Sequence, residues 1–148
     1  MLRYKSVGEV HKDFHGLTCA TLHYLIDRYG YESMETVIRK TAQEVYKTIH
    51  EKLKQGDTSE LTEYWEYYLG REQADFSIEQ TETFVRLTVK DCPALRHLEK
   101  LSQPADHILC KATEIFNSAL AQDTPFCASL TETGTYSCVQ EFLKGSEK

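Results

Sequence analysis

Residues 83–93, TFVRLTVKDCP, decide the fold class of this chain. The apolar residues at positions 85, 87 and 89 alternate with polar residues, and a period of two is typical of a β-strand with one buried face. Before residue 75 the apolar residues recur at the helical period instead. The change of period near residue 75 therefore predicts an α+β protein, with a helical N-terminal half packed on a later antiparallel sheet.

Three helices are expected before the change of period. The first covers about residues 6–29 and ends at Gly30, because glycine accepts the left-handed conformation that closes a helix. The apolar face of this helix, with Phe14, Leu17 and Leu22, is expected to turn toward the core. The second covers about residues 32–54 and ends at Gly56. A short third helix follows, with its N-cap at residue 57 or 58.

Two hairpins separated by helices are expected after the change of period. Residues 76–80 and 83–91 supply the first hairpin, and Pro93 opens a short helix because proline suits a first helical turn. A longer helix covers residues 104–120. Residues 125–143 form the closing hairpin, with Gly134 in its turn. The expected product is a single domain, residues 1–148, in which helices cover one face of a sheet of about four antiparallel strands.

Composition excludes several classes of function. The 148 residues carry a net charge of −6, from 17 basic and 23 acidic side chains, so the chain lacks the charge of a nucleic-acid-binding protein. No apolar stretch reaches the roughly 18 residues that cross a membrane. The first residues lack an apolar signal core, and five cysteines, an odd number, indicate reduced thiols. A cytoplasmic protein without nucleic-acid or membrane partners is expected.

A stripe of potential functional groups marks the first helix. In HKDFHGLTCATLH, residues 11–23, the side chains of His11, His15, Cys19 and His23 follow one another four residues apart. Each step overshoots a full turn by about 40°, so only neighbouring members can meet at one point. His15 beside Cys19 is the most suggestive pair, because an imidazole can help to generate a reactive thiolate. Catalysis, metal binding and ordinary packing all remain open for this stripe.

The other four cysteines lie in the second half of the chain. Cys92 precedes Pro93, Cys110 lies on the long helix, and Cys127 and Cys138 lie on the two arms of the closing hairpin, nearly opposite one another if the turn centres on residues 132–135. Their spacing is not that of a local zinc module. A scattered metal site of thiolates with His107 or a carboxylate, a catalytic thiol, and inert buried thiols are the alternatives. The acidic stretch TETGT resembles a solvated surface.

Four segments in order resemble one protein family. FHGLTCATLHYLIDRYG, VKDCPAL, LCKATEIFNSAL and TGTYSCVQEF together resemble the L-2-amino-thiazoline-4-carboxylic acid hydrolase family, over about residues 11–142. The matching positions are His15, Cys92, Cys110, Gly134 and Cys138. Members are small bacterial proteins, named after a ring-opening hydrolase on the route from aminothiazoline carboxylate to cysteine.

The resemblance implies a cofactor-free hydrolase that acts on a C–N or C–S bond of a small cyclic or amidine-like metabolite. Such an enzyme needs a nucleophile, a proton donor and a cation for the substrate carboxylate. Cys110 would be the nucleophile and His15 the acid/base, with Cys92 or Cys138 as a second thiol. The carboxylate would bind one of three arginines, which are Arg39, Arg86 and Arg96. A homo-oligomer is compatible with this interpretation.

The C-terminal part also resembles the 4-vinyl-reductase-type small-molecule-binding domain. That domain places a helix cysteine and hairpin cysteines around zinc, and here Cys110, Cys127 and Cys138 would correspond. This second resemblance implies a different class of protein, a non-catalytic domain that binds or senses a small molecule and holds a zinc ion.

Overall fold

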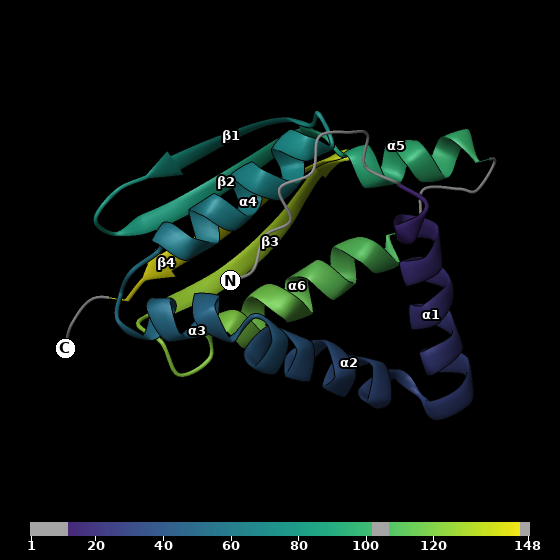
Figure 1. Cartoon of the computed structure of the whole chain (residues 1–148), viewed down its shortest axis with the longest axis horizontal. Coiled ribbons are helices and arrows are strands. Elements are labelled where there is room, and N and C mark those ends of the chain that lie inside the picture. Colours follow the sequence, from purple (N-terminus) through teal and green to yellow (C-terminus); the bar gives the residue numbers. More distant parts are fainter. Residues whose placement is uncertain (1–11, 102–106, 146–148) are drawn as a thin grey trace.

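The computed structural model describes residues 12–101 and 107–145 and confirms the predicted α+β architecture (Figure 1). Within these residues the chain forms six α-helices, one π-helical turn and four strands. Their order is α1 (Phe14–Tyr29), α2 (Tyr31–Lys40), η1 (Thr41–Val45), α3 (Lys47–Lys54), α4 (Ser59–Arg71), β1 (Asp75–Gln80), β2 (Phe84–Asp91), α5 (Pro93–Lys100), α6 (Ile108–Ala121), β3 (Phe126–Gly134) and β4 (Ser137–Lys144).

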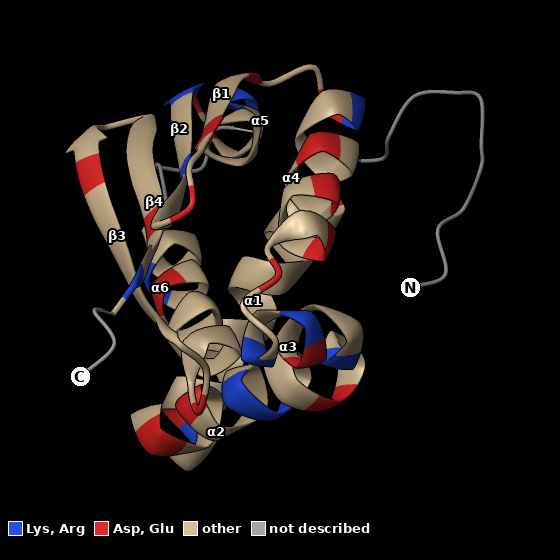
Figure 2. Ribbon diagram, turned by 90° about the vertical axis from the view of Figure 1, so that its left-hand side faces the viewer, with Lys and Arg blue, Asp and Glu red and all other residues tan. Residues whose placement is uncertain are grey.

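The four strands form one antiparallel sheet in the order β1-β2-β4-β3. Figure 2 shows that the helices lie on one side of this sheet. The alternation in β2 explains this arrangement, because Val85, Leu87 and Val89 are buried on the helix side while the residues between them are only partly covered. The sheet is therefore packed on one face, as the pattern of residues 83–93 predicts.

The main core lies between this sheet face and helices α3, α4 and α6. Its centre contains Trp65 of α4, whose ring lies 6.0 Å from that of Phe142 on β4, together with Leu120 of α6 and Ile49 of α3. Burial of large aromatic and aliphatic side chains is the dominant stabilising contribution in such a layer. This core fixes the position of α4 and of the residues that follow its C-terminus.

The second expected helix, residues 32–54, is interrupted by the π-helical turn η1. The turn inserts an extra residue into the helical repeat, and so rotates α3 relative to α2. Met34 and Ile38 of α2 consequently join one cluster with Leu22, while Ile49 and Leu53 of α3 join the main core. A single straight helix presents only one apolar face. Because of the interruption, α2 packs in the cluster around Leu22 while α3 packs in the main core.

Helix α1 differs from the expectation at its apolar face. Its buried residues are Cys19 and Leu22, whereas Phe14 and Leu17 are 46% and 70% exposed. The expectation that Phe14 and Leu17 face the core is wrong, because α1 lies at the edge of the molecule and packs on α2, α5 and α6 through the other side. The part of the expected helix before residue 12 lies outside the described residues.

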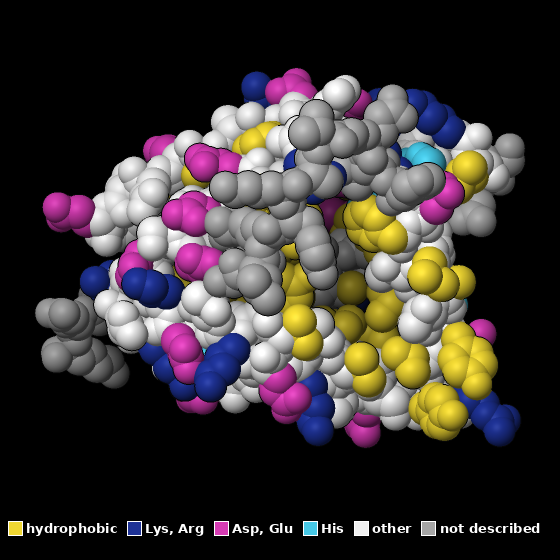
Figure 3. All heavy atoms as spheres, viewed as in Figure 1, with side chains coloured by type: hydrophobic (Ala, Val, Ile, Leu, Met, Phe, Trp, Pro, Cys, Tyr) yellow, Lys and Arg dark blue, Asp and Glu magenta, His cyan; other side chains and the backbone are white. Residues whose placement is uncertain are grey.

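Large apolar side chains gather on the surface where α1 and α2 meet. Figure 3 shows this hydrophobic area at the α1–α2 corner. The exposed apolar residues of the two helices are Phe14, Leu17, Tyr24, Tyr29, Tyr31 and Val37. Exposed apolar area of this kind is typical of contact surfaces. The predicted homo-oligomer stays a prediction.

Candidate functional site

A buried histidine–carboxylate pair joins α1 to the end of α4. His15 Nε2 lies 2.5 Å from Glu72 Oε1, and the two side chains are only 12% and 10% exposed. Lys12 Nζ donates a second hydrogen bond, at 3.2 Å, to the backbone oxygen of Glu72. Of the histidine stripe, His15 thus occupies a partnered, nearly buried position, while His23 is exposed and His11 lies outside the described residues.

The position of Glu72 follows from how α4 ends. Gln73 adopts a left-handed conformation with φ of 56°, and the N–H of Ala74 donates to the oxygen of Leu69 at 3.0 Å, so the chain leaves the helix directly after Glu72. The helix dipole disfavours a carboxylate at a helix C-terminus. A nearly buried carboxylate there therefore depends on a donor such as His15.

Glu72 lines a cleft of about 290 Å³ between the end of α4, the adjoining ends of β1 and β2, and α5. Volumes near 300 Å³ are at the lower end of those that hold small ligands. Its acidic residues besides Glu72 are Asp75 and Asp91. The basic residues of its wall are Lys12, Arg96, His97 and Lys100. The start of α1 and α5 lie together at this end of the sheet (Figure 1).

The basic residues of the cleft differ in how strongly they are already engaged. Arg96 Nε donates to Asp91 at 2.7 Å, and the Arg96 guanidinium lies 3.6 Å from the ring centre of Tyr136. His97 Nε2 lies 3.1 Å from a carboxylate oxygen just before α1. Lys100 has no ion-pair partner among residues 12–101 and 107–145. The Lys100 ammonium is thus available to an anionic ligand.

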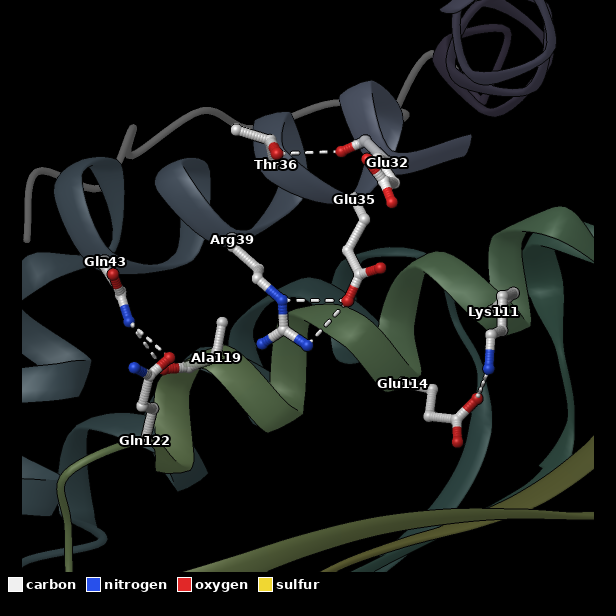
Figure 4. Close-up of polar contacts among 9 residues, drawn as sticks. All are labelled: Glu32, Glu35, Thr36, Arg39, Gln43, Lys111, Glu114, Ala119 and Gln122. Atoms are coloured by element: carbon white, nitrogen blue, oxygen red, sulfur yellow. Dashed lines mark hydrogen bonds and ion pairs between the residues drawn. The ribbon is translucent and has the colours of Figure 1, made fainter. Parts of the chain in front are cut away.

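The three arginines proposed as carboxylate partners lie in different parts of the molecule. Arg96 lines the cleft beside Glu72. Arg86 lies on the other face of the sheet, where Nη2 contacts Glu141 at 2.6 Å. Arg39 lies on α2 and donates two hydrogen bonds to Glu35, at 3.0 and 2.8 Å (Figure 4). The structure brings only Arg96 close to the His15–Glu72 pair.

Three of the predicted site thiols share one neighbourhood beside the cleft. Cys92 is the N-cap of α5, directly before the cleft residue Pro93, and its N–H donates to the oxygen of Tyr136 at 2.6 Å. Cys138 pairs with Val89 across β4 and β2. Cys92 and Cys110 pack on the same apolar cluster between α1 and α5. Cys92, Cys110 and Cys138 therefore lie in one neighbourhood, but none of the three lines the cleft itself, and their predicted convergence on one pocket stays a prediction.

These thiols are held in the protonated form. Burial, followed by the carboxylate of Glu132, raises the pKa of Cys110 to about 12. Burial likewise raises the pKa of Cys92, against the opposing effect of the N–H groups of Leu95 and Ala94, and burial also raises the pKa of Cys138. Because the thiolate is the nucleophile, Cys110 lacks the activation that covalent catalysis requires.

The remaining two cysteines lie elsewhere. Cys19 is buried against Leu95 and Leu98. Cys127 pairs with Leu143, whereas Cys138 pairs with Glu132, so Cys127 and Cys138 are not opposite one another and project to different faces of the sheet. The zinc ligand set of Cys110, Cys127 and Cys138 is therefore not assembled. The expectation failed because the hairpin turn lies further along the chain than residues 132–135 imply.

A second cluster forms where α6 begins. His107 Nδ1 is hydrogen-bonded to Glu132 of β3, and Cys110 Sγ lies 3.8 Å from the same nitrogen. His107 and Glu132 are 42% and 46% exposed. The sequence predicts His107 as a possible ligand of a scattered metal site. It predicts only a solvated surface for Glu132, and the strand register shows that this residue lies beside His107.

No family model matches the chain, and neither does any curated protein or solved structure. The two family resemblances of the sequence thus stay predictions. Within the described residues, no helix is both long enough and apolar enough to span a membrane.

Proposed function

We propose that this chain is a hydrolase that opens a C–N or C–S bond in a small cyclic or amidine-like metabolite bearing a carboxylate, such as a 2-aminothiazoline carboxylate. The observation that carries the proposal is Glu72, which lines a cleft that also has cationic side chains in its wall and which is paired with the nearly buried His15. The resemblance to the L-2-amino-thiazoline-4-carboxylic acid hydrolase family, in which His15 is a matching position, supports the substrate class.

The pair works as one acid/base unit. Glu72 lines the cleft, and His15 Nε2 lies 2.5 Å from its carboxylate. As a water oxygen bonds to the C=N carbon of the ring, the π electrons of the C=N bond move to the ring nitrogen, and the pair passes one proton of that water to this nitrogen. The ring C–S bond then breaks with its electron pair leaving on sulfur, the new hydroxyl becomes a carbonyl, and the pair carries the hydroxyl proton to the sulfur, which departs as a thiol. One water is consumed and no other reactant is needed. Positioned acid/base groups of this kind contribute typically 10²–10⁴-fold to a rate.

Cationic residues of the cleft provide the recognition of the carboxylate. Lys100 is available, and Arg96 lies next to it on α5 with a planar guanidinium suited to a carboxylate. The cleft volume of about 290 Å³ suits a single-ring metabolite better than a larger ligand. These features favour a small anionic substrate.

Water is the nucleophile in this proposal, and the thiols shape the adjoining wall. The raised pKa of Cys110 disfavours its role as an attacking thiolate. Cys92 lies closest to the cleft, beside Pro93, and its pKa is raised as well. The alternative of a non-catalytic binding domain would use the same cleft without turnover.

The test is to incubate the purified chain with 2-aminothiazoline-4-carboxylate and to follow the addition of one water by mass spectrometry. His15→Ala should lower turnover by about 10²–10⁴-fold. His23→Ala, on the exposed face of the same helix, is the matched control and should retain turnover. Binding of the compound without turnover by the unmodified chain would favour the binding domain. Equal activity of both variants would remove His15 from the mechanism.

A further inference from the structure

Three metal-binding side chains converge at the N-terminal end of α6. His107 and Cys110 are three residues apart and share one face of the first turn. Glu132 approaches them from β3. One potential ligand atom from each residue lies within 4.8 Å of the other two. Imidazole, thiolate and carboxylate are the three ligand types that zinc uses in proteins.

The separations resemble those around a tetrahedral ion. Bonds of about 2.3 Å to sulfur and about 2.05 Å to nitrogen at a tetrahedral angle place the two atoms about 3.6 Å apart. The distance from Cys110 Sγ to His107 Nδ1 is 3.8 Å. The same Nδ1 is hydrogen-bonded to Glu132, so the three groups meet around this nitrogen. An ion between the three groups requires the Glu132 carboxylate to move away from His107, and the side chain is about half exposed, which leaves room for that movement.

We propose that His107, Cys110 and Glu132 form a binding site for a divalent transition metal, with zinc as the ion that the ligand set suits best. Three protein ligands leave one tetrahedral position for water or an exogenous ligand. The exposure of His107 and Glu132 gives ions a path from solvent. Cys138 lies directly across the hairpin from Glu132 and is a further thiol beside the site.

This inference does not depend on the proposed hydrolase. The His15–Glu72 cleft and the His107 cluster use different residues from different elements. The competing explanation is a plain His107–Glu132 ion pair with a thiol beside it. The two explanations differ in whether Cys110 becomes a thiolate ligand of a metal ion. Spectroscopy can detect thiolate ligation directly, without a substrate.

The experiment titrates metal-free full-length protein with Co²⁺ under reducing conditions. About one Co²⁺ per chain should bind with the intense visible absorption of tetrahedral cobalt and a near-ultraviolet thiolate-to-cobalt charge-transfer band, and Zn²⁺ should displace it. Zn²⁺ should also protect Cys110 from alkylation. Absence of cobalt binding, or binding without a thiolate band, would overturn the proposal.

Variants assign the ligands. Cys110→Ser should abolish the charge-transfer band, and His107→Ala should weaken cobalt binding by at least about 10–100-fold. The His107 side chain is half exposed, so this second variant should fold normally, as far-ultraviolet circular dichroism will verify. Cys127→Ser, at an exposed cysteine on the other face of the sheet, is the matched control and should behave as the unmodified chain. Loss of the band in Cys127→Ser, or its persistence in Cys110→Ser, would overturn the assignment.

Discussion

Two histidine–glutamate pairs in the described part of the chain share the same chemistry and differ in burial. The His15–Glu72 side chains are 12% and 10% exposed, whereas those of His107 and Glu132 are 42% and 46% exposed. Burial strengthens an ion pair and also makes each partner costly to leave alone. Solvent weakens the exposed pair, and its groups remain open to ions. The same two residue types are therefore suited to proton transfer in one place and to metal binding in the other.

The surroundings of the two pairs reinforce this difference. Glu72 of the buried pair lines a cleft whose wall carries the acidic Asp75 and Asp91 as well as basic residues, and among the basic residues the Lys100 ammonium is available to an anionic group of a ligand. The exposed pair adjoins the Cys110 thiol, whose pKa is raised partly by the charge of Glu132. An acidic, sulfur-containing neighbourhood attracts cations rather than anions. Charge and burial together are the basis on which we propose a different ligand class for each pair.

The largest effect on folding is expected from breaking the buried pair. Glu72→Ala leaves His15 without its partner in a nearly buried position and should lower the free energy of unfolding by about 2–3 kcal/mol. Glu132→Ala is the matched variant at the exposed pair and should cost less than about 1 kcal/mol. Urea denaturation of metal-free protein measures both. Equal losses in the two variants would contradict the contrast in burial.

The thiol beside the exposed pair should react slowly with alkylating reagents. A pKa raised from 9.0 to about 12 makes the Cys110 thiolate fraction about a thousandfold smaller below pH 9, and the greater reactivity of a more basic thiolate recovers part of this loss. The alkylation rate of Cys110 should be about 30–60-fold below that of an unperturbed thiol and should keep rising as the pH increases beyond 9.

Native-state alkylation mapped by mass spectrometry measures this rate. The exposed Cys127 should be labelled first, and the buried Cys19 should be protected. Rapid labelling of Cys110 at neutral pH would restore its candidacy as an activated nucleophile.

Removal of the cation that is proposed to bind the substrate carboxylate should have a smaller effect, which is confined to KM. Lys100→Ala removes the available ammonium of the cleft and should raise KM for an anionic substrate by about tenfold, with little change in kcat, because the lost interaction is equal in ground and transition states. Lys47→Ala, at an exposed lysine on α3 that does not line the cleft, is the control. Steady-state kinetics separate the two constants, and an unchanged KM would show that Lys100 does not bind the substrate.

The sequence predicts the order of the elements well, because periodicity is a local property. The strand 83–91, the helix opened by Pro93 and the final hairpin all appear where they are expected. The π-helical turn cannot be recognised in the sequence, because the apolar residues around it still recur near the period of an α-helix. The pairing of Cys138 with Glu132 depends on hairpin register, which a shift of the turn by a few residues changes entirely.

The site was only partly predictable for a similar reason. His15 could be identified from the resemblance, but its partner Glu72 lies 57 residues away among many other acidic residues. The one local signal was a carboxylate at the end of a helix, where the dipole disfavours it. Likewise, nothing in the stretch TETGT distinguishes Glu132 from its exposed neighbours. Only the three-dimensional structure shows that Arg96, and not Arg39 or Arg86, lines the cleft.

The most direct test of the division between the two pairs is turnover of 2-aminothiazoline-4-carboxylate by Glu72→Gln and Glu132→Gln, measured side by side. Each variant replaces one carboxylate by an amide of nearly the same shape. Glu72→Gln should lose about 10²–10⁴-fold in kcat, and Glu132→Gln should keep the activity of the unmodified chain. Retained activity in Glu72→Gln, or equal loss in both variants, would contradict the assignment of catalysis to the buried pair.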